Sequence, residues 1–289
     1  MELPPWVKGA GGAVTAAELE AVRTAVAGGV LKGNYPNPGF AVDMATQAEI
    51  DAALADVATL ADLEAAIATL IAQTTETLFY ANFATENTNE FPEEQALPGR
   101  ISTTFVANVG EVATFEIQEG DPEVAGGHRS ELRDGNRYID GDDALFAIKL
   151  RRLAGDWTQF HIPFQLHDES EGGSTPVCLM FKEMEGRHYI WLGPGNSSAT
   201  WWRYDITGNE EAWLDLLIRV KVSATEGEVQ VWKDGVLQEI FGGGFVKQGL
   251  NTLGVGSLYS KIGSYRSKFA VGLTKVQIAW LGVMKRLVR

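Results

Sequence analysis

The run of short, alternating apolar and polar segments after residue 78 constrains the fold most strongly. A period of two places successive side chains on opposite faces of a strand. Turn dipeptides such as Asp134-Gly135 and Asp234-Gly235 separate these segments and favour tight hairpins. The pattern therefore predicts a mainly β fold, a sandwich or jelly roll, with strands over 101–107, 111–118, 128–134, 144–152, 157–162, 164–167, 176–182, 187–192, 200–206, 213–223, 227–233, 235–240, 252–261 and 270–284.

Before residue 77 the chain is rich in alanine, threonine and glutamate instead. Thr15-Ala16-Ala17-Glu18 and Thr46-Gln47-Ala48-Glu49 are capping boxes that predict a short and a longer helix. The longer helix carries a narrow apolar stripe close to a heptad seam: Ile50, Leu54, Val57, Leu60, Leu63, Ile67 and Leu70. We expect the stripe to form a coiled coil in a homotrimer, with packing on the chain's own β domain as the alternative. The predicted domains are an attachment segment (1–45), a coiled-coil stem (46–77) and a β domain (78–289).

Composition excludes several classes of protein. The single cysteine, Cys178, lies in an apolar run, so we expect a buried thiol and a fold assembled without disulfides in the cytoplasm. From residues 1–6, which lack a basic and an apolar region, we expect no secretion leader, and we expect no stretch to be long enough to span a bilayer. A formal net charge of −14 argues against nucleic-acid binding. It still allows a polyanionic sugar as a partner, because basic residues can gather in one groove.

Three segments place polar, ionisable side chains on one face of an expected strand. Arginine, glutamine, histidine, lysine and tyrosine together suit acid–base chemistry on an acidic polymer. The three faces hold Arg129, Glu131 and Arg133; Gln165 and His167; and Tyr259, Lys261, Gly263 and Tyr265.

Residues 28–38 resemble the Gly-Gly-x-Leu-x-Gly-x-Tyr-Pro-Asn-Pro motif of bacteriophage tail fibres and minor tail proteins. In those proteins the motif precedes a helical oligomerisation segment and a domain that faces the host. The resemblance implies a virion protein of the phage tail, assembled in the host cytoplasm and in contact with other tail proteins.

The three polar segments resemble, in order, the signature regions of jelly-roll polysaccharide lyases such as alginate, heparin and glucuronan lyases. They read Arg-Ser-Glu-Leu-Arg, Gln-x-His and Tyr-x-Lys-x-Gly-x-Tyr. Residues 227–235 are also similar to a segment of concanavalin-like sandwiches. Together these resemblances imply a concanavalin A-like jelly roll and an enzyme that cleaves by β-elimination at a uronic acid.

The lyase resemblance also implies roles for single residues. Arg129 and Gln165 would neutralise the uronate carboxylate, because developing negative charge needs hydrogen-bond donors. His167 would be the base, or would position one, and Tyr265 would be the acid, or acid and base together. Binding of the substrate would fall to Arg133, Lys261 and Tyr259, with Glu131 orienting the arginines.

Other interpretations of these segments stay open. Arg129, Glu131 and Arg133 could form an ion-pair ladder on a solvated sheet face. Gln159-Phe160-His161 repeats the Gln-x-His pattern, and Pro163 should break or bulge the strand between the copies. We prefer the second copy because a polar turn follows it. Ser260 and Arg266-Ser267 depart from the alginate-lyase form of the third motif, which leaves the glycan's identity open.

Weaker patterns complete the candidate sites. Trp202 and Tyr204 are predicted to form a sugar-stacking platform, with core packing or a role in an interface as the alternatives. Asp140-Gly141-Asp142-Asp143 could bind Ca²⁺, although an exposed turn is the expected structure. His128 and His188 lack ligand spacing, so we expect neither zinc nor another cofactor.

The expected function is therefore that of a phage tail protein that binds and depolymerises an acidic host-surface polysaccharide. A non-catalytic, lectin-like receptor-binding domain is the first alternative. A purely structural virion protein is the second.

Overall fold

The computed structural model describes residues 75–81, 83, 91–170, 175–195 and 199–286. The predicted attachment segment and most of the predicted stem lie outside these residues. In the described ranges the chain forms strands, and none of it is a helix long and apolar enough to cross a membrane.

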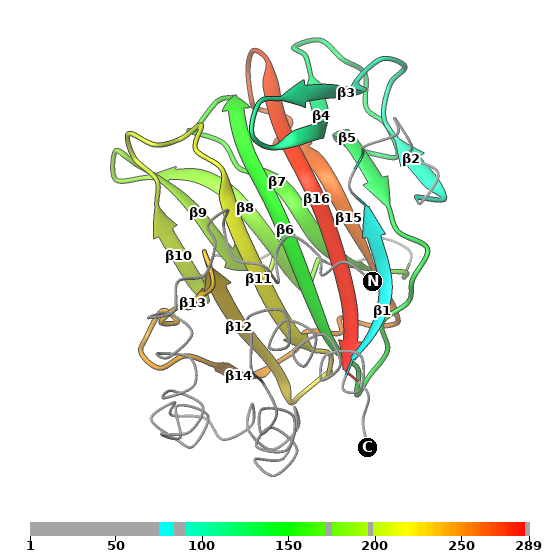
Figure 1. Cartoon of the computed structure of the whole chain (residues 1–289), viewed down its shortest axis with the longest axis vertical. Coiled ribbons are helices and arrows are strands. Elements are labelled where there is room, and N and C mark those ends of the chain that lie inside the picture. The colour runs from blue at the N-terminus through cyan, green and yellow to red at the C-terminus, as the bar shows by residue number, and fades with distance from the viewer. Residues whose placement is uncertain (1–74, 82, 84–90, 171–174, 196–198, 287–289) are drawn as a thin grey trace, which may run out of the picture.

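Two antiparallel sheets pack face to face in the described part of the chain (Figure 1). The nine-stranded sheet follows the order β13-β12-β11-β6-β16-β4-β3, with β1 paired to β16 and β14 to β12. Its strands are β1 (Thr75–Ala81), β3 (Ile101–Val106), β4 (Gly110–Ile117), β6 (Asp143–Ala154), β11 (Leu214–Lys221), β12 (Gly227–Lys233), β13 (Val236–Leu237), β14 (Lys247–Leu250) and β16 (Thr274–Arg286).

The seven-stranded sheet follows the order β10-β9-β8-β7-β15-β5-β2. Its strands are β2 (Glu93–Gln95), β5 (His128–Arg133), β7 (His161–Asp168), β8 (Val177–Met184), β9 (Arg187–Gly193), β10 (Trp202–Asp205) and β15 (Leu258–Arg266). Strands β7, β15 and β5, which carry the three polar segments, are direct neighbours although they lie far apart in the sequence.

The hydrophobic core lies between the two sheets. Phe146 of β6 and Phe164 of β7 meet across it, with ring centroids 5.3 Å apart. Leu132, Leu166 and Ile262 are fully buried on the core side of β5, β7 and β15. Because strand side chains alternate, these apolar residues leave their polar neighbours on the outer face of the seven-stranded sheet.

The predicted sandwich is confirmed, with local differences in the strands. Residues 157–160 of the expected strand 157–162 form a turn, and only His161 and Ile162 belong to β7, which also holds the expected strand 164–167. The pairing of β7 shifts register between His161 and Phe164. Pro163 lies at this bulge, which suits a residue without a backbone donor. The strand expected at 252–261 begins only at Leu258. The residues before it form a turn, in which the Asn251 side-chain oxygen accepts hydrogen bonds from the backbone N–H groups of Leu253 and Gly254.

Candidate active site

Strand register brings the three polar segments onto one surface. Lys261 of β15 lies opposite Arg133 of β5 on one side and Gln165 of β7 on the other. Tyr259 pairs with His167, and Tyr265 with Arg129. Residues directly opposite each other in a ladder point to the same face, so all of these side chains share the outer face of the sheet.

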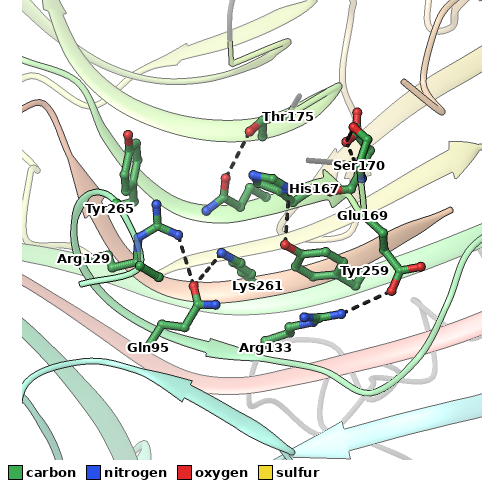
Figure 2. Close-up of a pocket in the computed structure, with 14 residues that line it drawn as sticks. Gln95, Arg129, Arg133, His167, Glu169, Ser170, Thr175, Tyr259, Lys261 and Tyr265 are labelled. Atoms are coloured by element: carbon green, nitrogen blue, oxygen red, sulfur yellow. Dashed lines mark hydrogen bonds and ion pairs between the residues drawn. The ribbon is translucent and has the colours of Figure 1, made fainter. Parts of the chain in front are cut away.

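A cleft of about 540 Å³ opens on this surface (Figure 2). The four predicted catalytic residues line it together with three of the predicted binding residues: Arg129, Gln165, His167, Tyr265, Arg133, Tyr259 and Lys261. The structure thus brings into one cleft seven side chains that span more than a hundred residues of sequence.

Glu131 lies beneath the cleft rather than in its lining, with 1% of its surface exposed. Its carboxylate accepts a hydrogen bond from Gln165 and lies 3.4 Å from Arg129 Nη1 and 3.7 Å from Lys261 Nζ. A buried carboxylate needs such partners, because desolvation of an unpaired charge is costly. Glu131 therefore fixes the floor of the cleft and contacts one of the two arginines that it was expected to orient.

Arg133 forms one end of the cleft. Its guanidinium carbon lies 3.7 Å from the centroid of the Tyr259 ring, a cation–π stack. Nη1 donates to Glu93 at 2.9 Å and Nη2 to Glu169 at 3.2 Å. Burial raises the pKa of the Tyr259 hydroxyl, so this phenol stays protonated at neutral pH.

His167 has the hydrogen bonding of a neutral base. Its Nδ1 lies 2.7 Å from the carbonyl oxygen of Asp168, which can only accept, so Nδ1 carries the proton and Nε2 keeps a lone pair. The Tyr259 hydroxyl lies 3.3 Å from the same Nδ1. Burial lowers the pKa of His167, and nearby Lys261 lowers it further, which keeps the imidazole uncharged at neutral pH.

Tyr265 and Lys261 face the cleft near Arg129. The Arg129 guanidinium carbon lies 4.9 Å from the Tyr265 ring centroid. Lys261 is only 2% exposed, and burial lowers the pKa of its ammonium group. Among the described residues, its amine meets Glu131 and the Gln95 side chain. The cleft therefore combines a neutral imidazole, a phenol and at least two cations.

Gln95 is a lining residue that the sequence patterns missed. It belongs to β2, an edge strand of three residues too short to show alternation. Its Oε1 accepts hydrogen bonds from Arg129 Nη1 at 3.1 Å and from Lys261 Nζ at 2.7 Å.

The predicted stacking pair does not line this cleft. Trp202 is 1% exposed and packs in the core, so its indole cannot stack on a sugar. Tyr204 lies on β10 at the far edge of the sheet, with the Lys233 amine 4.4 Å from its ring centroid. The core-packing alternative describes Trp202 correctly.

The two Gln-x-His copies occupy different places. Gln165 and His167 line the cleft, whereas His161 is fully buried on the core side of β7 and Gln159 precedes that strand. Ser260, one of the departures from the alginate-lyase motif, also points into the core and donates to Asp134. That substitution therefore lies away from the surface that a glycan would contact.

No group of three or more His, Cys, Asp or Glu side chains in the described ranges is arranged to hold a metal ion. Two of the aspartates considered for Ca²⁺ have other partners. Asp142 accepts the backbone N–H of Ile139 and pairs with Lys285 at 2.5 Å. Asp143 pairs with Arg219 at 2.7 Å.

Several solved alginate lyases are similar to this chain at low sequence identity. Family 7 alginate lyase A1-II′ in complex with substrate is 14% identical, with a TM-score of 0.47 over 67% of this chain and 84% of that one. An alginate lyase from Pseudomonas aeruginosa is 19% identical, with a TM-score of 0.40 over 63% of this chain and 84% of that one. The exolytic family 7 alginate lyase from Zobellia galactanivorans is 11% identical, with a TM-score of 0.44 over 65% of this chain and 88% of that one.

No curated protein matches the chain. A model of a protein family, described as polysaccharide lyase, matches residues 80–284. This range exceeds half of the chain and includes every strand of the cleft. With its three motifs gathered in one cleft of a β sandwich, the chain belongs to the polysaccharide lyase family.

Proposed function

We propose that this domain binds an acidic polysaccharide in the cleft and cleaves it by β-elimination at a uronate residue. The observation that supports this most is the convergence of Arg129, Gln165, His167 and Tyr265 on one open cleft. A base, an acid and donors for a carboxylate within one site are what the reaction requires.

The proposed reaction begins with the carboxylate of the sugar. Arg129 and Gln165 donate hydrogen bonds to it, which lowers the energy of the enolate that forms when the C5 proton leaves. The Gln165 amide has two N–H groups, and one of them goes to Glu131. The other remains for the substrate.

Proton transfer completes the elimination. His167 Nε2 takes the C5 proton, and the electron pair of the C5–H bond forms the C4=C5 double bond. The C4–O4 bond breaks, and O4 receives the proton of the Tyr265 hydroxyl. Solvent restores the tyrosine proton and removes the proton from His167, so both residues return to their starting states.

The test is a panel of purified polyuronates, including alginate, polygalacturonate and polyglucuronate. Cleavage is followed by the ultraviolet absorbance of the new double bond conjugated to the carboxylate. We expect activity on at least one polymer and a loss of about 10²- to 10⁴-fold in kcat for Tyr265→Phe, which lacks the transferable proton. Tyr204→Phe is the matched control, because Tyr204 lies outside the cleft.

The result also separates the alternatives. Tight binding without any unsaturated product would favour a non-catalytic, lectin-like domain. Neither binding nor cleavage of any polymer would contradict the proposal and favour a structural role.

We further propose that the domain works on a phage tail, at the end of a trimeric stem. Support comes from the sequence of residues 28–38 and from the apolar stripe between Ile50 and Leu70. The partners in this proposal are other tail proteins and the acidic polysaccharide of the host surface. The proposed location is the virion, after assembly in the host cytoplasm.

A further inference from the structure

Strand β2 brings Gln95 into the cleft and Glu93 beside Arg133, both from outside the three motifs. Gln95 lies opposite Glu131 of β5, and Glu93 lies opposite Arg133. Residues two apart on a strand share a face, so Glu93 and Gln95 both point to the side that carries the arginines. Figure 2 shows Gln95 below Arg129 and Lys261, with dashed hydrogen bonds to both.

The chemistry of its neighbours fixes the orientation of the Gln95 amide. Its oxygen accepts from Arg129 and Lys261, while its nitrogen donates to the carboxylate of Glu93. A flipped amide would turn its N–H groups toward two cations, which only donate. The two cations therefore contact an amide oxygen of β2 rather than a carboxylate oxygen, while the Glu93 carboxylate pairs with Arg133, 2.9 Å away.

Arg129 and Lys261 consequently retain positive charge. Among the described residues, the carboxylate within ion-pair distance of either cation is that of Glu131, which serves both. The Gln95 oxygen accepts a hydrogen bond from each cation but carries no charge, so it does not neutralise the charge of Arg129 or Lys261. Arg129 and Lys261 thus share one carboxylate within ion-pair distance, so a second carboxylate can pair with them directly.

We propose that Gln95 is a specificity-determining residue that reserves Arg129 and Lys261 for the carboxylate of a uronate sugar. Its amide oxygen contacts both cations where a carboxylate oxygen would bind, and the substrate's carboxylate replaces it. This inference rests on the proposed function, since it concerns how the same cleft selects a carboxylated sugar.

A charge exchange on β2 tests the inference. Gln95→Glu places a permanent carboxylate against the two cations, and the double variant Glu93→Gln/Gln95→Glu does so without changing the net charge of the protein. Trimannuronate, trigalacturonate and triglucuronate are titrated calorimetrically at low salt, and thermal unfolding checks that each variant folds. We expect both variants to bind at least about tenfold more weakly than the unaltered chain, because the new carboxylate competes with that of the sugar.

Two further variants separate charge from structure. Gln95→Met has similar length and no acceptor, and we expect its affinity to stay within about threefold, because the sugar carboxylate then supplies the acceptor. Gln248→Glu makes the same chemical change on the exposed strand β14, outside the cleft, and should leave binding unchanged. In an active protein the Gln95→Glu effect should fall mainly on KM rather than on kcat.

Three results would overturn the inference. One is a double variant that binds like the unaltered chain, since affinity would then follow net charge alone. Another is Gln95→Met losing as much affinity as Gln95→Glu, which would make the amide structural. The third is an unaltered chain that binds none of the three sugars. By contrast, an unaltered chain that binds a sugar but releases no unsaturated product contradicts only the proposed cleavage.

Discussion

At the scale of single residues, the core side of β7 holds an unusual basic group. His161 is fully buried, and Arg152 of β6 is 1% exposed with its guanidinium carbon 3.6 Å from the Trp157 ring centroid. Burial, together with the nearby charges of Arg152 and Arg266, lowers the pKa of His161 to about 2. The folded chain therefore holds this imidazole in its neutral form.

The His161 pKa makes stability depend on pH. The unfolded imidazole titrates near its ordinary value of 6.5, so below that pH the unfolded chain binds a proton that the folded chain excludes. The stabilisation is complete above about pH 6.5 and is lost as pH falls toward the folded pKa, at up to about 1.4 kcal/mol per pH unit. Urea unfolding at several pH values should show this slope, and His161→Phe should reduce it.

The remaining slope in His161→Phe belongs partly to His167, whose pKa is also lowered. An unchanged slope in the variant would contradict the assignment to His161. The free energy of unfolding at neutral pH should change little, because His161 has no hydrogen-bond partner among the described residues.

At the scale of elements, the pairing of β15 with β5 depends on Gly263. Its φ of +137° favours glycine, and a Cβ there would lie 2.3 Å from the Ser130 carbonyl oxygen and 2.8 Å from Glu131 Cα. The glycine allows two strands of the cleft to approach closely. Through that approach Glu131 is held beneath the cleft that Tyr265 lines.

Gly263→Ala should therefore separate β15 from β5. We expect a loss of more than about 2 kcal/mol in the free energy of unfolding, because both backbone strain and a backbone clash must be relieved. Denaturant unfolding measures the loss. Ser264→Ala on the same strand is the control, since its hydroxyl has no partner among the described residues. Equal stability of the two variants would show that the strands can shift at little cost.

Sequence patterns predict the faces of these elements better than their partners. Alternation alone places Lys261 on the polar face of its strand, and strand register sets it beside Gln165 in the cleft. The same parity turns Ser260 into the core, so its departure from the motif matters less than the sequence suggests. Gln95 could not be predicted, because a three-residue strand has no period and its place depends on pairing with β5, far along the chain. The prediction that Trp202 stacks on a sugar is wrong, because an alternating aromatic pattern does not tell the buried face of a strand from the exposed one.

At the scale of the whole molecule, the oligomeric state remains a prediction from the apolar stripe. Light scattering on the full chain should give the mass of a trimer. Leu54→Asp with Leu63→Asp places charges in the seam and should yield a monomer, because unpaired charges in a coiled-coil core cost several kcal/mol. Binding of sugar by each domain should persist in the monomer. A full chain that is monomeric without substitution would contradict the stem.

The pairing of β1 with β16 has a consequence for how such a domain is used. The first described strand and the last lie side by side, with Thr75 opposite Arg286, in the sheet that does not carry the cleft. Residues opposite each other in an antiparallel ladder have Cα atoms about 5 Å apart. The two ends of the described domain therefore lie next to each other. Both ends of the described domain belong to the sheet opposite the cleft, so a connection made there need not cross the cleft.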